Sequence, residues 1–127
     1  MQVFYRLAAR AAKLFRELES YDAFVAEAHH RRKRDAPSGT ALELQQIVRT
    51  GMGADVAVTS TRAGYIPGSH RIGFDSEADQ ILLSHEALNR EGFATGALMA
   101  AQWIVGKRGV FEFAEVFDQI VRERNYS

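Results

Sequence analysis

The stretch that decides the expected fold is E-A-H-H-R-R-K-R-D-A-P-S-G-T-A, residues 27–41, where a strand pattern changes into a helix pattern. Small and apolar residues at 23–29 predict a buried strand that ends at the histidine pair. Pro37 and Ser38 are residue types that favour a helix start, and we expect this helix to cover 37–48. The run R-R-K-R lies between the two, so a strongly basic loop is expected beside a helix N-terminus.

Apolar residues at helical or alternating spacing continue along the chain on both sides of this stretch. We predict helices at 3–18, 89–105 and 113–124, and strands at 55–62, 70–74 and 80–85. The order helix, strand, helix, three strands, helix, helix predicts an α+β fold. We expect a mainly antiparallel mixed sheet with helices on one face.

The second face of this sheet raises the question of a partner. We predict that the apolar and small residues of the last three strands cannot all share one face, so that some point away from the helices. They are Val56, Val58, Ser60, Ile72, Phe74, Ile81 and Leu83. An apolar sheet face in a small domain indicates oligomerisation through that face.

Length and composition exclude several classes of protein. The chain has 127 residues, which suits a single domain over 1–127. Its 16 basic and 16 acidic residues cancel, whereas a dedicated nucleic-acid-binding protein is usually basic, so we expect no nucleic-acid partner. The absence of cysteine is compatible with a reducing cytoplasm, where we expect the protein to act. No apolar run is long enough to cross a bilayer, and we expect no membrane partner.

The basic loop and the helix start together predict a binding site for an anion. A helix N-terminus presents unpaired N–H groups and a partial positive charge. Gly39 would let a ligand approach the backbone, and Ser38 and Thr40 would add hydroxyl donors. Lys33 would add a point charge and His30 another donor. Such a site suits a carboxylate or a phosphate.

His29 lies beside this predicted site and is a candidate proton donor, because imidazole groups titrate near neutral pH. A buried structural role for one of the two histidines is an open alternative, and R-R-K-R alone could be a solvated loop or a phosphate-backbone contact. A zinc site would have to use His29, His30, His70 and His85. Neighbouring strand residues point to opposite faces and no H-E-x-x-H spacing occurs, so we expect no metal.

The stretch 27–41 resembles the motif E-x-H-H-x-x-K-x-D-x-P-S-G-T-A of the dihydrodipicolinate reductases, also called 4-hydroxy-tetrahydrodipicolinate reductases. The segment T-S-T-R-A-G-Y-I-P-G-S-H-R-I-G-F, residues 59–74, resembles a second segment of that family, R-x-G-x-x-x-G-x-H. The likeness extends over essentially the whole chain. It implies an NAD(P)H-dependent oxidoreductase of lysine and diaminopimelate biosynthesis that acts on a cyclic dicarboxylate.

The resemblance also implies roles for single residues. His29 matches the proposed general acid, and Lys33 the lysine that assists it and binds substrate. The groups that hold the substrate's carboxylates match His30, Ser38, Gly39 and Thr40. His70, His85, Arg62 and Gly64 are expected to be structural or interfacial. The family forms homotetramers, which the resemblance implies are assembled through the sheet of this domain.

The family's other domain is a Rossmann domain that holds NADH or NADPH through a glycine-rich loop. Here no G-x-x-G-x-x-G follows a predicted strand. We therefore expect this chain to correspond to the C-terminal substrate-binding domain, with no cofactor-binding residue of its own. A Rossmann domain would be needed in cis or in trans for activity. The alternative is a stand-alone dicarboxylate-binding or scaffold module without reductase activity.

Overall fold

A computed structural model of the chain describes residues 1–89 and 91–125. The elements follow the order α1 (Gln2–Arg16), β1 (Asp22–His29), α2 (Gly39–Met52), β2 (Ala57–Arg62), β3 (Ser69–Asp75), β4 (Gln80–Glu86), α3 (Glu91–Trp103) and α4 (Phe113–Asn125). They form two compact units, of which the first comprises Val3–Leu88 with Met1 and the second contains Asn89–Ser127.

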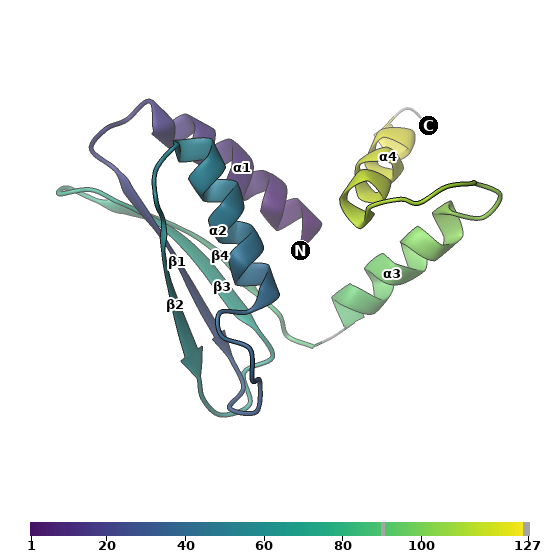
Figure 1. Cartoon of the computed structure of the whole chain (residues 1–127), viewed down its shortest axis with the longest axis horizontal. Coiled ribbons are helices and arrows are strands. Elements are labelled where there is room, and N and C mark those ends of the chain that lie inside the picture. The colour runs from purple at the N-terminus through teal and green to yellow at the C-terminus, as the bar shows by residue number, and fades with distance from the viewer. Residues whose placement is uncertain (90, 126–127) are drawn as a thin grey trace. The chain divides into compact units, whose positions relative to one another are not determined.

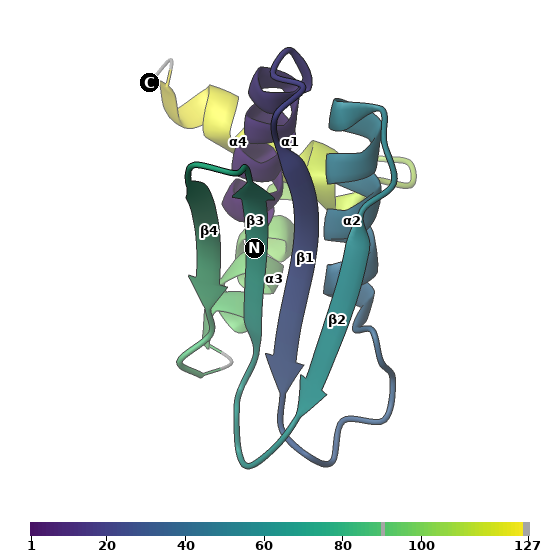
Figure 2. The same ribbon diagram turned by 90° about the vertical axis from the view of Figure 1, so that its left-hand side faces the viewer.

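The first unit is built on a four-stranded sheet with the order β2-β1-β3-β4 (Figure 2). β1 and β2 run parallel and are joined through α2, whereas β1–β3 and β3–β4 are antiparallel. The sheet is therefore mixed and mainly antiparallel, and the α+β prediction is confirmed. The parallel pair matters for function because the carboxyl ends of β1 and β2 meet at one edge, where α2 begins.

Helices α1 and α2 cover one face of the sheet (Figure 1). The buried residues of α1 are Phe4, Ala8 and Ala12, which recur at intervals of four and so form one stripe. α2 contributes Ala41, Leu44, Val48 and Gly51 to the same core. The two helices approach closely, since a Cβ added at Gly51 would lie 2.5 Å from the Cβ of Ala12. The core therefore depends on small residues between the helices.

The strand register corrects the prediction about the second sheet face. Val58, Ile72 and Leu83 lie in one row with the buried Val25, and Phe74 and Ile81 lie in one row with Ala23. Ser60 lies opposite Glu27, and Val56, just before β2, is buried. All seven residues therefore belong to the covered side, because partners in register share a face. The prediction was wrong because each strand's alternation was considered without the register that aligns the strands.

The open face of the sheet, which points away from α1 and α2, carries mostly small and polar residues. By register these are Asp22, Phe24, Ala26, Ala28, Ala57, Thr59, Thr61, Ser69, Arg71, Gly73, Asp75, Gln80, Leu82, Ser84 and Glu86. The ring of Phe24 lies over Gly73, where an added Cβ would come within 2.2 Å of it. Because this face is not apolar, its composition does not support the predicted partner.

The second unit consists of α3 and α4 and confirms the helices predicted at 89–105 and 113–124, although Arg90 lies outside the described residues. Trp103, Val116 and Ile120 are buried together. Phe111 meets the indole of Trp103 edge-on, with ring centroids 5.1 Å apart. Within the described ranges 1–89 and 91–125, no helix is long and apolar enough to span a membrane.

Candidate functional site

The polar residues of the covered face gather at one end of the sheet, where β1 and β2 finish and α2 starts. His29 and Arg62, the last residues of the two parallel strands, are partners in register. Ser60, Glu27, His70 and His85 form the neighbouring row across all four strands. A sheet edge of this kind, at the carboxyl ends of parallel strands beside a helix N-terminus, is a common place for ligand sites in α/β folds.

Glu27 is the centre of this polar end, and its side chain has no exposed area. Its Oε1 accepts hydrogen bonds from the backbone N–H of Ser38 at 3.1 Å and from Arg62 at 2.8 Å. Its Oε2 accepts one from Arg62 at 2.9 Å and contacts Nδ1 of His29 at 2.5 Å. The carboxylate therefore ties together the ends of two strands and the start of α2.

These contacts decide the charge of Glu27. Burial raises the pKa of its carboxyl, but hydrogen bonds from Arg62, His29, Ser60 and Ser38 outweigh burial and lower the pKa to about 2. The hydrogen bond to Glu27 in turn raises the pKa of Arg62. Both groups are therefore charged at neutral pH, and an ionised carboxylate can only accept hydrogen bonds. It follows that Nδ1 of His29 donates to Glu27.

His70 and Ser38 lie next to this ion pair. Oγ of Ser38 accepts a hydrogen bond from the N–H of Ala41 at 3.1 Å, so Ser38 is the N-cap of α2, which begins at Gly39, two residues after the predicted start at Pro37. The same Oγ lies 3.1 Å from Nε2 of His70, whose ring meets that of His29 edge-on. Burial, together with the neighbouring His29, lowers the pKa of His70 to about 4, so His70 is neutral at pH 7.

The basic loop places Lys33 and His30 nearer to solvent. Nζ of Lys33 pairs with Asp35 at 2.9 Å, and the Lys33 side chain is 26 % exposed. Nδ1 of His30 accepts a hydrogen bond from the backbone N–H of Arg32 at 3.2 Å. Neutral His30 would therefore carry its proton on Nε2, where it could donate to a ligand.

The three predicted residues at the start of α2 differ in what they can offer a ligand. Ser38 is 2 % exposed, and both its hydroxyl and its N–H are used within the protein. Thr40 has a side-chain hydrogen bond with Tyr5. Gly39 is exposed, and a Cβ added there would meet open space. The N–H groups of Gly39 and Thr40 precede the first helical hydrogen bond, which Leu42 donates to Ser38. They are the anion donors that this helix end presents.

Glu27, His29 and His70 also form a group that could hold a metal ion, with ligand atoms within 4.8 Å of one another. This group was not predicted from the sequence, where no metal was expected. Both oxygens of Glu27 accept hydrogen bonds from the Arg62 guanidinium. A cation placed there would meet a fixed positive charge, so we interpret the group as an ion-pair network.

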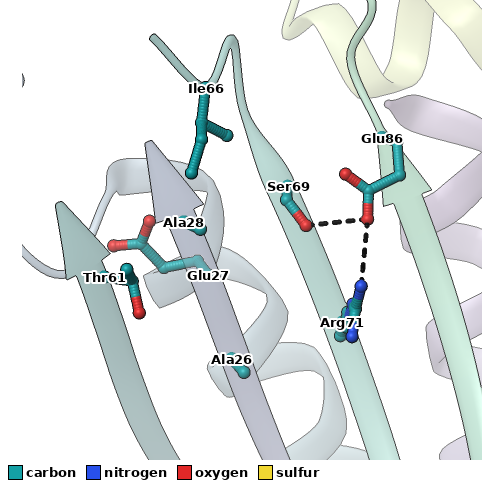
Figure 3. Close-up of a pocket in the computed structure, with 8 residues that line it drawn as sticks. All are labelled: Ala26, Glu27, Ala28, Thr61, Ile66, Ser69, Arg71 and Glu86. Carbon is teal, nitrogen blue, oxygen red and sulfur yellow. Dashed lines mark hydrogen bonds and ion pairs between the residues drawn. The ribbon is translucent and has the colours of Figure 1, made fainter. Parts of the chain in front are cut away.

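A separate cavity of about 400 Å³ lies along the sheet (Figure 3). Its lining is Ala26, Glu27, Ala28, Thr61, Ile66, Ser69, Arg71 and Glu86. The small side chains of Ala26 and Ala28 leave the strand surface hollow here. Ser69 donates to Glu86 at 2.8 Å, and Arg71 pairs with the same carboxylate at 3.7 Å. Three polar residues of this lining, Ser69, Arg71 and Glu86, are therefore paired with one another.

Two residues at the centre of the site received no binding or chemical role from the sequence. The sequence predicts no role for Glu27, and Arg62 is expected to be structural or interfacial. The signal for Glu27 was its position two residues before His29 in an apolar strand, which puts both side chains on the same buried face. A buried carboxylate needs a cationic partner. Nothing local identifies Arg62 as that partner, since it lies 35 residues further along the chain.

A model of the family described as "Dihydrodipicolinate reductase, C-terminus" matches residues 1–117. Among curated relatives, the 4-hydroxy-tetrahydrodipicolinate reductase of Methanoregula boonei is 39% identical over 91% of this chain and 51% of its own length. That of Gluconobacter oxydans is 42% identical over 83% of this chain and 50% of its own length. The chain therefore spans about half the length of these relatives.

A solved structure has a similar fold. It is described as "Dipicolinate bound Dihydrodipicolinate reductase from Paenisporosarcina sp. TG-14", and it matches with a TM-score of 0.65 at 22% identity. The match covers 80% of this chain and 46% of that chain. At this level of identity the likeness concerns the fold.

Proposed function

Since the chain belongs to the family of dihydrodipicolinate reductase C-terminal domains, we propose that it is the substrate-binding and oligomerisation domain of a 4-hydroxy-tetrahydrodipicolinate reductase. The reductase would act in lysine and diaminopimelate biosynthesis in the cytoplasm, with residues 1–127 as one functional domain. One observation carries the proposal. His29, held through Nδ1 by a buried carboxylate, lies at the strand end beside the free N–H groups of α2.

The substrate class that this arrangement suits is a cyclic dicarboxylate. The N–H groups of Gly39 and Thr40, together with the partial charge of the helix end, would hold one carboxylate. Lys33 would release Asp35 and pair its ammonium group with a carboxylate of the ligand. His30 would donate a hydrogen bond to the ligand from Nε2. Ser38 would act by capping α2, since its polar groups are already bonded.

His29 would deliver the proton of the reduction from Nε2, the ring nitrogen that Glu27 leaves free. The nicotinamide cofactor, NADPH or NADH, would supply the hydride. We propose that this chain does not hold that cofactor, because the loop between β1 and α2 has no glycine before Gly39 and so lacks a glycine-rich phosphate-binding turn. We therefore place the cofactor in a Rossmann domain that acts in cis or in trans, and expect this chain alone to be inactive.

Oligomerisation would use the open face of the sheet, and we propose a homotetramer. An apolar face was expected from the sequence, whereas the open face is hollow and mostly polar. Its large apolar side chains, Phe24 and Leu82, are the groups that support an interface there. Phe24→Asp should shift the assembly toward the monomer in sedimentation velocity. A distribution identical to that of the wild type would remove this face from the interface.

Calorimetric titration of the chain with dipicolinate, NADH and NADPH tests the proposal. We expect weak binding of dipicolinate and none of either nucleotide. Pyridine-2-carboxylate, which lacks one carboxylate, is the matched control ligand and should bind more weakly. Failure of dipicolinate to bind would contradict the substrate class, and nucleotide binding or turnover by the chain alone would contradict the separate cofactor domain.

Adding the nicotinamide-binding domain of a relative separates the reductase from a stand-alone dicarboxylate module. Recovery of dipicolinate-sensitive oxidation of NADPH or NADH is expected for a reductase domain. Dipicolinate binding without any recovery, in a mixture where the added domain binds its nucleotide, would favour the binding module instead.

A further inference from the structure

Arg62 uses every N–H of its guanidinium at the polar end of the sheet. Nε donates to the carbonyl of Lys33 at 3.2 Å. One terminal nitrogen donates to Glu27 and to the carbonyl of Thr61, and the other donates to Glu27 and to the carbonyl of Asp35. These five contacts match the five donors of the group. Arg62 therefore joins the buried carboxylate to the backbone of the loop that carries Lys33.

Glu27 in turn orients His29. The carboxylate lies two residues before His29 on the same face and meets Nδ1 at 2.5 Å. Since Glu27 is ionised, the hydrogen bond requires a proton on Nδ1, and Nε2 becomes the nitrogen that exchanges its proton. Nε2 faces Gly68, where a Cβ would lie 3.2 Å away, so the glycine keeps this side of the ring uncrowded.

We infer that the Arg62–Glu27 ion pair positions two parts of the site. It fixes His29 as the Nδ1–H tautomer, and it holds the backbone of the Lys33 loop in place. One guanidinium thus couples the proposed proton donor to the proposed substrate lysine. The assignment of the tautomer stands on the contacts themselves. The effect on ligand binding rests on the proposed function.

Lysine cannot replace Arg62 in this role. It has one nitrogen with three donors and no planar fork, so it cannot bind both oxygens of Glu27 and three carbonyls together. Arg62→Lys keeps the positive charge and removes the geometry. Arg49→Lys is the matched control, because Arg49 forms an exposed ion pair with Asp55 at 3.4 Å. Glu27→Gln removes the anion while keeping the size of the side chain.

Long-range ¹H–¹⁵N correlation spectra of histidine-labelled protein test the tautomer directly. The signals of His29 are assigned by their loss in His29→Gln, and spectra are taken at about pH 8, where imidazoles are generally neutral. In the wild type we expect His29 as the Nδ1–H tautomer. We expect a mixture with the Nε2–H form in Arg62→Lys and in Glu27→Gln, and the wild-type pattern in Arg49→Lys.

An Nε2–H tautomer in the wild type would overturn the inference, and so would unchanged tautomers in both folded variants. If neither variant folds, the wild-type spectrum alone decides which tautomer His29 adopts.

Dipicolinate titration adds the second readout, where Arg62→Lys should weaken binding about tenfold and Arg49→Lys should leave it unchanged. If the wild type shows the Nδ1–H tautomer and binds no dipicolinate, the proposed function fails while the positioning of His29 stands. Equal affinity of wild type and Arg62→Lys would overturn the coupling to the loop.

Discussion

The two ends of the covered sheet face are built by the same strands with the same alternation, but one end is apolar and the other is polar. At one end, rows such as Ala23–Phe74 and Val25–Ile72 are fully or almost fully buried. At the other end, the same face continues with Glu27, His70 and His29, which are buried as well. Both ends exclude water, but the first does so with apolar atoms and the second with polar groups.

The difference shows what keeps each end stable. The apolar end gains free energy from the area it removes from water. The polar end gains little from burial and is stable only because its charges are matched, as in the hydrogen bonds that Glu27 accepts from His29, Ser38 and Arg62. Substitutions at the apolar end should therefore change the free energy of unfolding, whereas those at the polar end should change kinetics, ligand affinity or the pH dependence of stability.

The largest effect is expected for His29→Gln in a reductase assembled with a nicotinamide-binding domain. Loss of the proton donor should lower kcat by about 10²–10⁴-fold while KM changes little. Steady-state kinetics with the wild type and with His85→Gln in parallel measure this. His85 shares the polar face but lies on the outermost strand β4, so its variant should stay close to wild type. Near-normal kcat in His29→Gln would remove His29 from the acid role.

The apolar end should respond through stability alone. Phe74 is completely buried and stacks on Phe15 with centroids 4.2 Å apart. Phe74→Ala should lower the free energy of unfolding by about 3–5 kcal/mol, measured by denaturant unfolding. Leu42→Ala, at a position 49% exposed on α2, is the control and should cost far less. Comparable losses in the two variants would contradict the placement of the core.

The pH dependence of stability reports on the polar end. Burial lowers the pKa of His70 from 6.5 to about 4 in the folded state, and the titratable groups that face it are His29, Glu27, His85 and Glu86. The unfolded state therefore binds more protons between these values, and stability falls as the pH drops through them. Between pH 7 and 5 we expect a loss of about 2 kcal/mol from this group.

The matched control for this effect is His70→Gln, which removes the titrating group and keeps a polar side chain. Denaturant unfolding of both proteins at each pH gives the difference in slope. Because the pKa of Glu27 is lowered to about 2, its contribution is lost only below pH 4.5, outside this window. Parallel slopes in the two proteins would show that His70 titrates as in the unfolded chain.

The smallest effect is expected for Lys33→Ala, which removes a partly exposed charge from the ligand side of the loop. Dipicolinate affinity should fall about tenfold, as for the loss of one hydrogen bond to a charged group. Arg34→Ala removes an exposed charge of the same sign and should change affinity much less. Equal losses would indicate that the loop acts by its overall charge and that Lys33 makes no specific contact.

The strands, the helices and, to within two residues, the start of α2 could be predicted from the sequence, because each depends on local periodicity and capping. The sequence also predicts that His29, His30, Lys33 and Gly39 act together, since they are close in the chain, and this grouping stays a prediction. The face on which Val58, Ile72 and Leu83 lie could not, because it depends on how three strands are aligned.

By itself the sequence determined the α+β class and the basic loop before α2, because periodicity and turn chemistry act over a few residues. Only the tertiary structure decided the network of Glu27, Arg62, Ser38 and His70, whose members come from three strands and a helix start. Such contacts depend on strand register, which is set jointly by the burial of all four strands. No single segment contains that information.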